Sequence, residues 1–198
     1  WPILVACRTV RQTWTVTVPS PCRMCWPCSG PSVKTALNKM RPHLPHAAFR
    51  VLIFLAPLCP ICQNMTYDLR MLEEEFADAP VEFVGLFPNA STRPDQMAAF
   101  KTAYGLNMAF QQDTAQWAQQ LGAHWTPEVF VLDAQDSVLY QGRINDRYFA
   151  PGRRKNKTRH RDLRDALLEI TQGQPVTLPR TDAVGCPIEG MAVPLKTD

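Results

Sequence analysis

An abrupt change of hydrophobic pattern between residues 49 and 76 constrains the fold more than any other part of the sequence. Val51–Ala56 is an unbroken apolar run, too short to cross a membrane and without helical periodicity, which is typical of a strand buried on both faces. The apolar residues that follow recur at helical spacing on one face: Met65, Leu69, Leu72 and Phe76. The pattern predicts a buried strand that leads directly into an amphipathic helix.

Two cysteines, Cys59 and Cys62, lie at this junction, with Pro60 in the first helical turn, where its missing N–H costs nothing. The unpaired N–H groups and the dipole at a helix N-terminus stabilise a thiolate, so we expect a lowered pKa for Cys59. Cys62 lies one turn further along, near enough to form a disulfide with Cys59 or to resolve a mixed disulfide there. The spacing favours a redox dithiol over two structural thiols.

Metal binding is the other chemistry that these cysteines suggest. Half of a zinc site at Cys59 and Cys62 would need further ligands, and downstream there are only residues without ligand-like spacing: Cys186, His124 and His160. Cys22, Cys25 and Cys28 form a second group that could bind zinc or an iron–sulfur cluster, or form a disulfide. We favour neither metal site, because a fourth ligand for the second group would have to come from one of three residues: Cys7, His43 or His46. No cofactor is predicted.

Length and composition limit the other possibilities. The 198 residues, 45% of them apolar, suit one domain with appendages. A net charge of only +3 argues against a dedicated nucleic-acid-binding protein. No apolar run approaches the roughly 18 residues of a membrane span. Because the first residue is Trp1 and not Met, we expect a processed or truncated product.

Hydrophobic periodicity and turn residues predict the remaining elements in order: strand 81–87, helix 95–104, strand 108–110, helix 113–122, strands 128–133 and 137–143, and helix 161–171. Thr126-Pro127 immediately precedes one of these strands. A proline fits a strand start, and an X-Pro bond is the kind that readily adopts cis.

A cysteine pair at a strand-to-helix turn, followed by Thr126-Pro127, a strand hairpin and a helix, resembles the thioredoxin superfamily over Phe49–Gln174. The peroxiredoxin-like branch of redoxin proteins, of the alkyl hydroperoxide reductase/thiol-specific antioxidant type, is most similar. Three segments carry that resemblance in order: Thr126–Asp133, Gly142–Tyr148 and Gly185–Ile188. It implies an α/β, thioredoxin-like fold with a central mixed sheet flanked by helices.

This reading divides the chain into three parts. Residues 49–174 would form the thioredoxin-like domain, and residues 175–198 an extended tail. Residues 1–48 would be an irregular, cysteine-rich extension that adds at most a strand and a short helix to the domain.

The resemblance also implies roles for the site residues. Cys59 would be the exposed attacking thiol and Cys62 the resolving one. Pro127 would be cis and face the disulfide, and the backbone of Thr126 would pair with the substrate chain. A plain strand-entry proline is the alternative for Pro127.

The sequence departs from the family pattern at the positions that move protons and bind peroxide. Ile53 stands where thioredoxin has a buried, proton-accepting Asp, so Glu128 is the candidate replacement, with a surface strand residue as the alternative. Leu52 and Ala56 stand where peroxiredoxins carry the Pro and Thr of their PxxxTxxC motif, so a peroxide-activating pocket is not visible.

Cys186 and a basic segment complete the candidates. Cys186 is either a third redox thiol, pairing with Cys59 or with an N-terminal cysteine, or a small buried apolar residue. The basic segment is either a surface that steers an acidic partner or a solvated loop and helix start: Arg153, Arg154, Lys155, Lys157, Arg159, Arg161 and Arg164.

Three functions follow from these observations. The leading one is a thiol-disulfide oxidoreductase that exchanges with protein thiols or disulfides and with a reducing or oxidising redox protein. The second is a thiol-dependent peroxidase acting on a hydroperoxide. The third is a copper or zinc carrier that binds through Cys59 and Cys62.

The expected location is extracytoplasmic, periplasmic or lipid-anchored, rather than cytoplasmic. The seven cysteines point this way, since disulfides persist in oxidising compartments. Residues 4–7, which end at Cys7, also resemble a bacterial lipobox, in which the Cys would be acylated.

Overall fold

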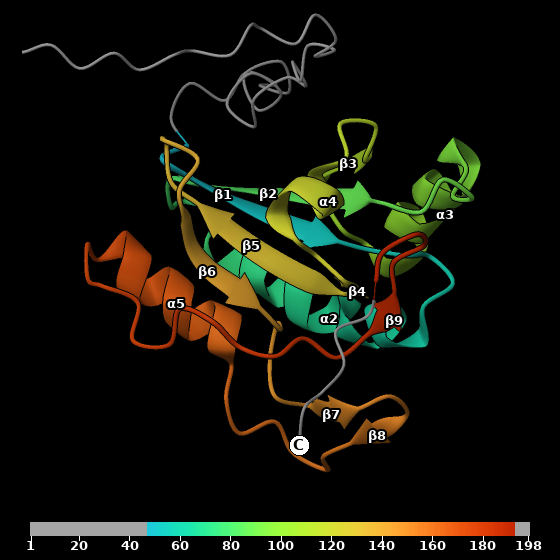
Figure 1. Ribbon diagram of the computed structural model, residues 1–198. Coiled ribbons are helices and arrows are strands. Elements are labelled where there is room, and N and C mark those ends of the chain that lie inside the picture. Colours follow the sequence, from blue (N-terminus) through green and yellow to red (C-terminus); the bar gives the residue numbers. More distant parts are fainter. Residues whose placement is uncertain (1–46, 193–198) are drawn as a thin grey trace, which may run out of the picture. The chain divides into compact units, whose positions relative to one another are not determined.

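The structure, a computed structural model, describes residues 47–192 (Figure 1). Cys7 and the Cys22, Cys25, Cys28 group lie outside the described residues. The elements follow in order: β1 (Phe49–Phe54), α2 (Pro60–Glu75), β2 (Val81–Phe87), α3 (Pro94–Tyr104), β3 (Ala109–Gln112), α4 (Trp117–Leu121), β4 (Trp125–Thr126), β5 (Glu128–Leu132), β6 (Val138–Gly142), β7 (Tyr148–Ala150), β8 (Arg153–Arg154), α5 (Asp162–Thr171) and β9 (Cys186–Pro187).

Five of these strands form a mixed sheet in the order β3-β2-β1-β5-β6. β1 runs parallel to β2 and antiparallel to β5, and Ile53 pairs with Gly85 on one side and Val129 on the other. β1 is therefore central, and the loop that follows it carries the two cysteines. The predicted mixed sheet and its flanking helices are confirmed.

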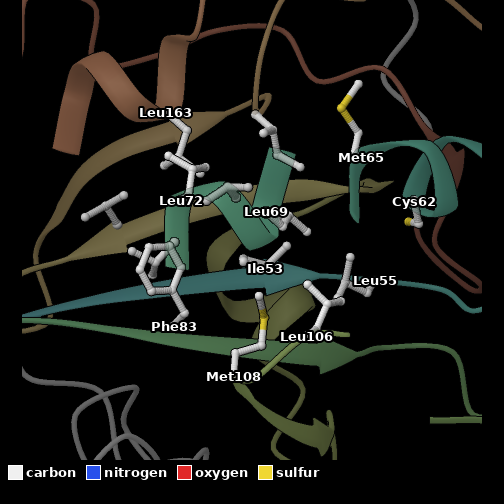
Figure 2. Close-up of a cluster of buried hydrophobic side chains, with 14 of the residues drawn as sticks. Ile53, Leu55, Cys62, Met65, Leu69, Leu72, Phe83, Leu106, Met108 and Leu163 are labelled. Carbon is white, nitrogen blue, oxygen red and sulfur yellow. The ribbon is translucent and has the colours of Figure 1, made fainter. Parts of the chain in front are cut away.

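Alternate residues of β1 face two different apolar clusters. Val51 and Ile53 pack with the buried faces of α2 and α5, whereas Leu52 and Phe54 pack with α4 on the opposite face (Figure 1). The four predicted helix-face residues are all buried: Met65, Leu69 and Leu72 of α2, and Phe76 at its C-cap. Figure 2 shows Leu69 and Leu72 over Ile53, with Cys62 at the end of the same cluster.

The two helices that follow β2 differ in how well they were predicted. α3 ends where expected, because Gly105 takes the left-handed conformation with φ 62°. α4 is shorter than the predicted helix 113–122. The carboxylate of Asp113 accepts hydrogen bonds from the N–H groups of Trp117 and Ala118 at 2.7 and 2.9 Å. Gln116 at the N-cap is left-handed, with φ 58°, so the helix begins four residues after Asp113.

The described chain after α5 packs back onto the domain. Backbone hydrogen bonds of 2.9 Å join Gln141 of β6 to Pro179 and Thr181. Further on, β9 pairs antiparallel with β4, and Ile188 is buried against the α4 side of the sheet. Within residues 47–192, no helix has the length and apolarity needed to cross a membrane.

Candidate active site

Cys59 is the N-cap of α2, at the junction of strand and helix that the sequence predicted. Its backbone is extended, with φ −77° and ψ 117°, and Pro60 begins the helix. The Cys59 carbonyl accepts the first helical hydrogen bond, from the N–H of Gln63 at 3.1 Å. The helix therefore presents its N-terminal end and its partial positive charge to the Cys59 sulfur.

The surroundings of Cys59 favour a thiolate. A hydrogen bond from the Cys62 thiol is the largest cause that lowers the pKa of Cys59, burial opposes it, and the Cys186 thiol lowers the pKa further, to about 5. Two neighbouring thiols thus act as donors to one sulfur. At neutral pH Cys59 is ionised, which is the reactive form of a cysteine.

Cys62 is in the opposite condition. It is fully buried and lies at the end of the apolar cluster under α2 (Figure 2). Burial raises the pKa of the Cys62 thiol well above its usual value, and the hydrogen bond and charge of Cys59 raise it further. The pair therefore shares one negative charge, which resides on Cys59.

The Thr126–Pro127 peptide bond is cis and lies against Cys59. The Cys59 thiol group lies 3.1 Å from the Thr126 carbonyl oxygen, to which it donates when protonated. The structure thus brings together four of the residues that the sequence analysis selected: Cys59, Cys62, Thr126 and Pro127.

Cys186 joins the same cluster from the other end of the chain. Its sulfur lies 2.6 Å from the sulfur of Cys59, and it is partly exposed. Burial raises the pKa of Cys186 to about 12, with the hydrogen bond to Cys59 and its charge adding to the effect. Cys59, Cys62 and Cys186 are all free thiols in this structure.

The implied exposure of Cys59 is wrong for this conformation. Only 3% of Cys59 is accessible to solvent. The physical reason is the returning tail: Cys186 pairs with Thr126 in the β4–β9 ladder and covers the sulfur. Without the returning tail, this face of Cys59 would be open to solvent.

Glu128 is not the surface strand residue of the alternative interpretation, because it is buried, with only 5% of the residue exposed. Its Oε2 accepts hydrogen bonds from the backbone N–H groups of His124 and Trp125 at 2.8 and 3.1 Å. Its Oε1 lies 3.4 Å from the side-chain amide of Gln141. The carboxylate therefore holds the chain that leads into β4.

A cavity of about 350 Å³ adjoins the cysteines on the side of Cys186. Its wall combines the first turn of α2 with the β7–β8 hairpin and the tail, and includes Pro60, Ile61, Tyr148, Gly152, Arg154 and Cys186. Tyr148 and Gly152 were not predicted as site residues from the sequence. Tyr148 closes the segment Gly142–Tyr148 that carried part of the family resemblance, and this was the signal available.

Two of the seven residues of the basic segment make ion pairs within the domain. Lys155 contacts Asp146 at 2.6 Å, and Arg164 contacts Glu75 at 2.5 Å. These two side chains are therefore held against the domain. Across the part of the chain that the structure describes, no group of three or more His, Cys, Asp or Glu residues is arranged to hold a metal ion.

The mixed sheet, the cysteine pair at the first turn of α2 and the cis-proline together define a thioredoxin-like protein. The family model for Redoxin matches residues 45–148, which is more than half of the chain, and the chain belongs to the redoxin family. The comparison with curated proteins gave no match.

Several solved structures are similar to this chain at low sequence identity. A hypothetical protein from Sinorhizobium meliloti 1021 is 23% identical with a TM-score of 0.65, covering 75% of this chain and 82% of that one. An uncharacterized conserved protein from Geobacillus kaustophilus is 22% identical with a TM-score of 0.63, covering 75% and 80%. A thioredoxin-like protein from Aeropyrum pernix is 18% identical with a TM-score of 0.44, covering 48% and 69%.

Proposed function

We propose that the protein is a thiol-disulfide oxidoreductase in which Cys59 attacks and Cys62 resolves. The observation that carries the proposal is the placement of the two thiols: Cys59 is the N-cap of α2, 3.1 Å from the Thr126 carbonyl oxygen, and Cys62 is buried one turn further along. Their acidities agree with this placement. The pKa of Cys59 is lowered to about 5, and that of Cys62 is raised. One thiol is thus a ready nucleophile, whereas its neighbour keeps its proton until it is needed.

The reaction follows from this division. The Cys59 thiolate attacks one sulfur of a partner's disulfide, the Cys59–partner bond forms, and the other partner sulfur leaves as a thiolate. Cys62 then gives up its proton and attacks the Cys59 sulfur. The Cys59–Cys62 disulfide forms and the second partner thiolate leaves, so that two electrons have passed to the partner. The reverse sequence oxidises a partner dithiol, and the reduction potentials set the direction.

Thr126 and Pro127 would orient the partner chain. A partner segment that added to β4 as a further strand would be held by backbone hydrogen bonds beside the cis-proline. Its sulfur would then lie next to Cys59, which lies 3.1 Å from the Thr126 carbonyl oxygen. Glu128 would be a positioning residue, because its carboxylate fixes the backbone of His124 and Trp125 before β4.

The test is reduction of insulin by the full chain with dithiothreitol as the electron source, beside trapping of mixed disulfides. Replacement C59S should lower the rate by at least about 100-fold and trap no partner. Replacement C62S should also lower turnover but accumulate Cys59–partner disulfides, which mass spectrometry identifies. Both variants replace a cysteine sulfur by an oxygen, and the two positions are three residues apart, so each variant is the control for the other.

Two other results would contradict the proposal. Rapid consumption of a hydroperoxide without insulin reduction would make the protein a thiol peroxidase. Stoichiometric copper or zinc in protein purified without chelator, combined with no activity in either assay, would make it a metal carrier.

A further inference from the structure

The segment Gly185–Ile188 lies where the proposed function places a partner chain. Thr126 pairs with Cys186 and Trp125 with Pro187 in an antiparallel ladder. The Ile188 N–H donates to the His124 carbonyl at 3.0 Å, and the Thr126 hydroxyl donates to the Cys186 carbonyl at 3.3 Å. The strand beside the cis-proline is therefore already paired, and it is paired with the protein's own tail.

The packing at Gly185 shows how closely this segment fits. A Cβ atom at Gly185 would lie 2.3 Å from the Thr126 carbonyl oxygen and 3.1 Å from the Pro127 nitrogen. These contacts are to backbone and cannot be relieved by a rotamer change. The tail approaches β4 at this distance only because residue 185 lacks a side chain.

The tail brings a sulfur to the position that a partner's sulfur would take. The Cys186 and Cys59 sulfurs are 2.6 Å apart, compared with about 2.05 Å in a disulfide bond. Cys59 is 3% exposed, whereas Cys186 lines the 350 Å³ cavity beside Pro60 and Tyr148. A partner that enters this cavity meets Cys186 first.

We propose that Gly185–Ile188 is a built-in substrate strand and that Cys186 is a relay thiol, which exchanges disulfides with Cys59 and passes them to an external protein dithiol or accepts them from an external protein disulfide. The proposal rests on the proposed function and identifies the thiol through which partners reach the buried pair.

The exchange is balanced at each step. Starting from the Cys59–Cys62 disulfide, the Cys186 thiol loses its proton and its sulfur attacks the Cys59 sulfur. The Cys59–Cys186 bond forms, the Cys59–Cys62 bond breaks, and Cys62 takes up a proton. A partner thiolate then attacks Cys186 from the cavity, forms a Cys186–partner disulfide and expels the Cys59 thiolate. A second partner thiol displaces Cys186, which leaves three protein thiols and an oxidised partner.

The acidities support this order. The pKa of Cys59 is about 5, which makes it a good leaving group when the partner attacks Cys186. In the reduced protein, burial raises the pKa of Cys186 to about 12. The hydrogen bond to Cys59 and the negative charge of Cys59 contribute to this rise. In the oxidised protein, the Cys59–Cys62 disulfide carries no charge, so the contribution of the Cys59 charge to the raised pKa of Cys186 is absent. Cys186 is therefore more reactive in the oxidised protein than in the reduced one.

The test maps disulfides in the full chain after reduction and brief oxidation with diamide. Trypsin places Cys59 and Cys62 in the peptide 51–70 and Cys186 in the peptide 181–196. Mass spectrometry therefore distinguishes an internal Cys59–Cys62 bridge from a link between the two peptides, and in C62S such a link must come from Cys59. In C62S, we expect most of Cys59 to be linked to Cys186. Cys59 linked mainly to N-terminal cysteines, or left as a free thiol while other cysteines are oxidised, would overturn the proposal.

A second variant tests the strand itself. G185V should slow formation of the Cys59–Cys186 bond in the C62S background by at least about tenfold, because proximity is lost. D182V, which introduces the same side chain at an exposed tail position, should leave the rate unchanged. Formation of the Cys59–Cys62 disulfide by G185V with Cys62 intact shows that the site is folded. An unchanged rate in G185V would refute the built-in strand.

A turnover assay distinguishes failure of the Cys186 relay from failure of the proposed function. With a synthetic peptide dithiol and pre-oxidised protein, C186S should oxidise the peptide at least about tenfold more slowly than the wild type. If C186S keeps the full rate, the relay is refuted and the proposed function stands. If Cys59–Cys186 forms but neither insulin nor the peptide is turned over, the proposed function fails and the three-thiol exchange stands.

Discussion

The two thiols that contact Cys59 are held in place very differently. Cys62 belongs to α2, whose following turns bury Leu69 and Leu72 against the sheet. Cys186 belongs to a two-residue strand, β9, which pairs with β4 and is followed by the buried Ile188. The acidity of Cys59 therefore depends first on a long, packed helix, whereas access to Cys59 depends on a short paired segment.

The largest expected effect is on the ionisation of Cys59. Replacement C62A removes the largest cause that lowers the pKa of Cys59 from 9.0 to about 5, and C186A removes a smaller one. The pKa should rise in both variants, and more in C62A. The measurement is the ultraviolet absorbance of the thiolate against pH, taken as a difference from the same variant with C59S. A larger rise in C186A would reverse the comparison.

The same shift predicts the pH dependence of stability. The folded pKa of Cys59, about 5, is below its unfolded value of 9.0. Ionisation of Cys59 therefore stabilises the fold fully above pH 9, and this contribution is lost as the pH falls towards 5. Denaturant unfolding of the reduced protein across this range should show a slope that C59S lacks.

The next largest effect is expected from the packing of α2. L69A should lower the free energy of unfolding by about 2 to 5 kcal/mol, because a fully buried leucine leaves a cavity under the helix. Met71 is on the exposed side of the same helix, at 40%, and M71A should change stability by less than about 0.5 kcal/mol. Urea unfolding measures both. Equal losses would mean that α2 is not held by its buried face.

Glu128 connects the two regions, because its carboxylate fixes the backbone ahead of β4, which β9 pairs with. E128A should lower the free energy of unfolding by about 1 to 3 kcal/mol, since two partly buried N–H groups lose their acceptor. E128Q keeps an acceptor oxygen and should recover most of the stability and the activity. If E128Q were as inactive as E128A, with an altered pH profile of insulin reduction, Glu128 would be the proton acceptor suggested by its position in the sequence.

The smallest effect on stability is expected in the tail. I188A should lower the free energy of unfolding by less than L69A does, by about 2 kcal/mol or below. A segment that opens locally before the rest of the domain unfolds contributes less to the free energy of global unfolding. The rate of Cys59 alkylation should nevertheless rise at least about tenfold as the tail detaches more often. L178A, at an exposed tail position, is the control for both measurements. Unchanged alkylation in I188A would show that β9 does not control access.

The sequence predicts well what depends on local pattern. The apolar run of β1, the helical face of α2, the positions of Cys59 and Pro60 and the end of α3 at Gly105 each follow from periodicity or from a capping residue. The start of α4 was missed because Asp113, which binds the N–H of Trp117, lies four residues before the helix. The N-cap residue is Gln116, and the pattern of side chains does not predict its left-handed conformation.

The candidate site was predicted only in part, because its parts lie far apart in the chain. Resemblance indicated Thr126 and Pro127, and Cys186 was selected without a definite partner. The coverage of Cys59 results from a contact between residues 127 positions apart, and no local signal specifies such a contact. The burial of Glu128 likewise depends on the path of the chain through His124 and Trp125.

The anchoring of the tail at β6 has a consequence for solubility. β6 is an outer strand of the sheet, and the N–H and carbonyl groups on a free outer strand invite pairing with another molecule and aggregation. Gln141 instead bonds to Pro179 and Thr181, which lie before Gly185 in the chain. Because this attachment is separate from the β4–β9 ladder, a displacement of Cys186 from Cys59 would leave Gln141 of β6 paired and would not free that margin of the sheet for aggregation.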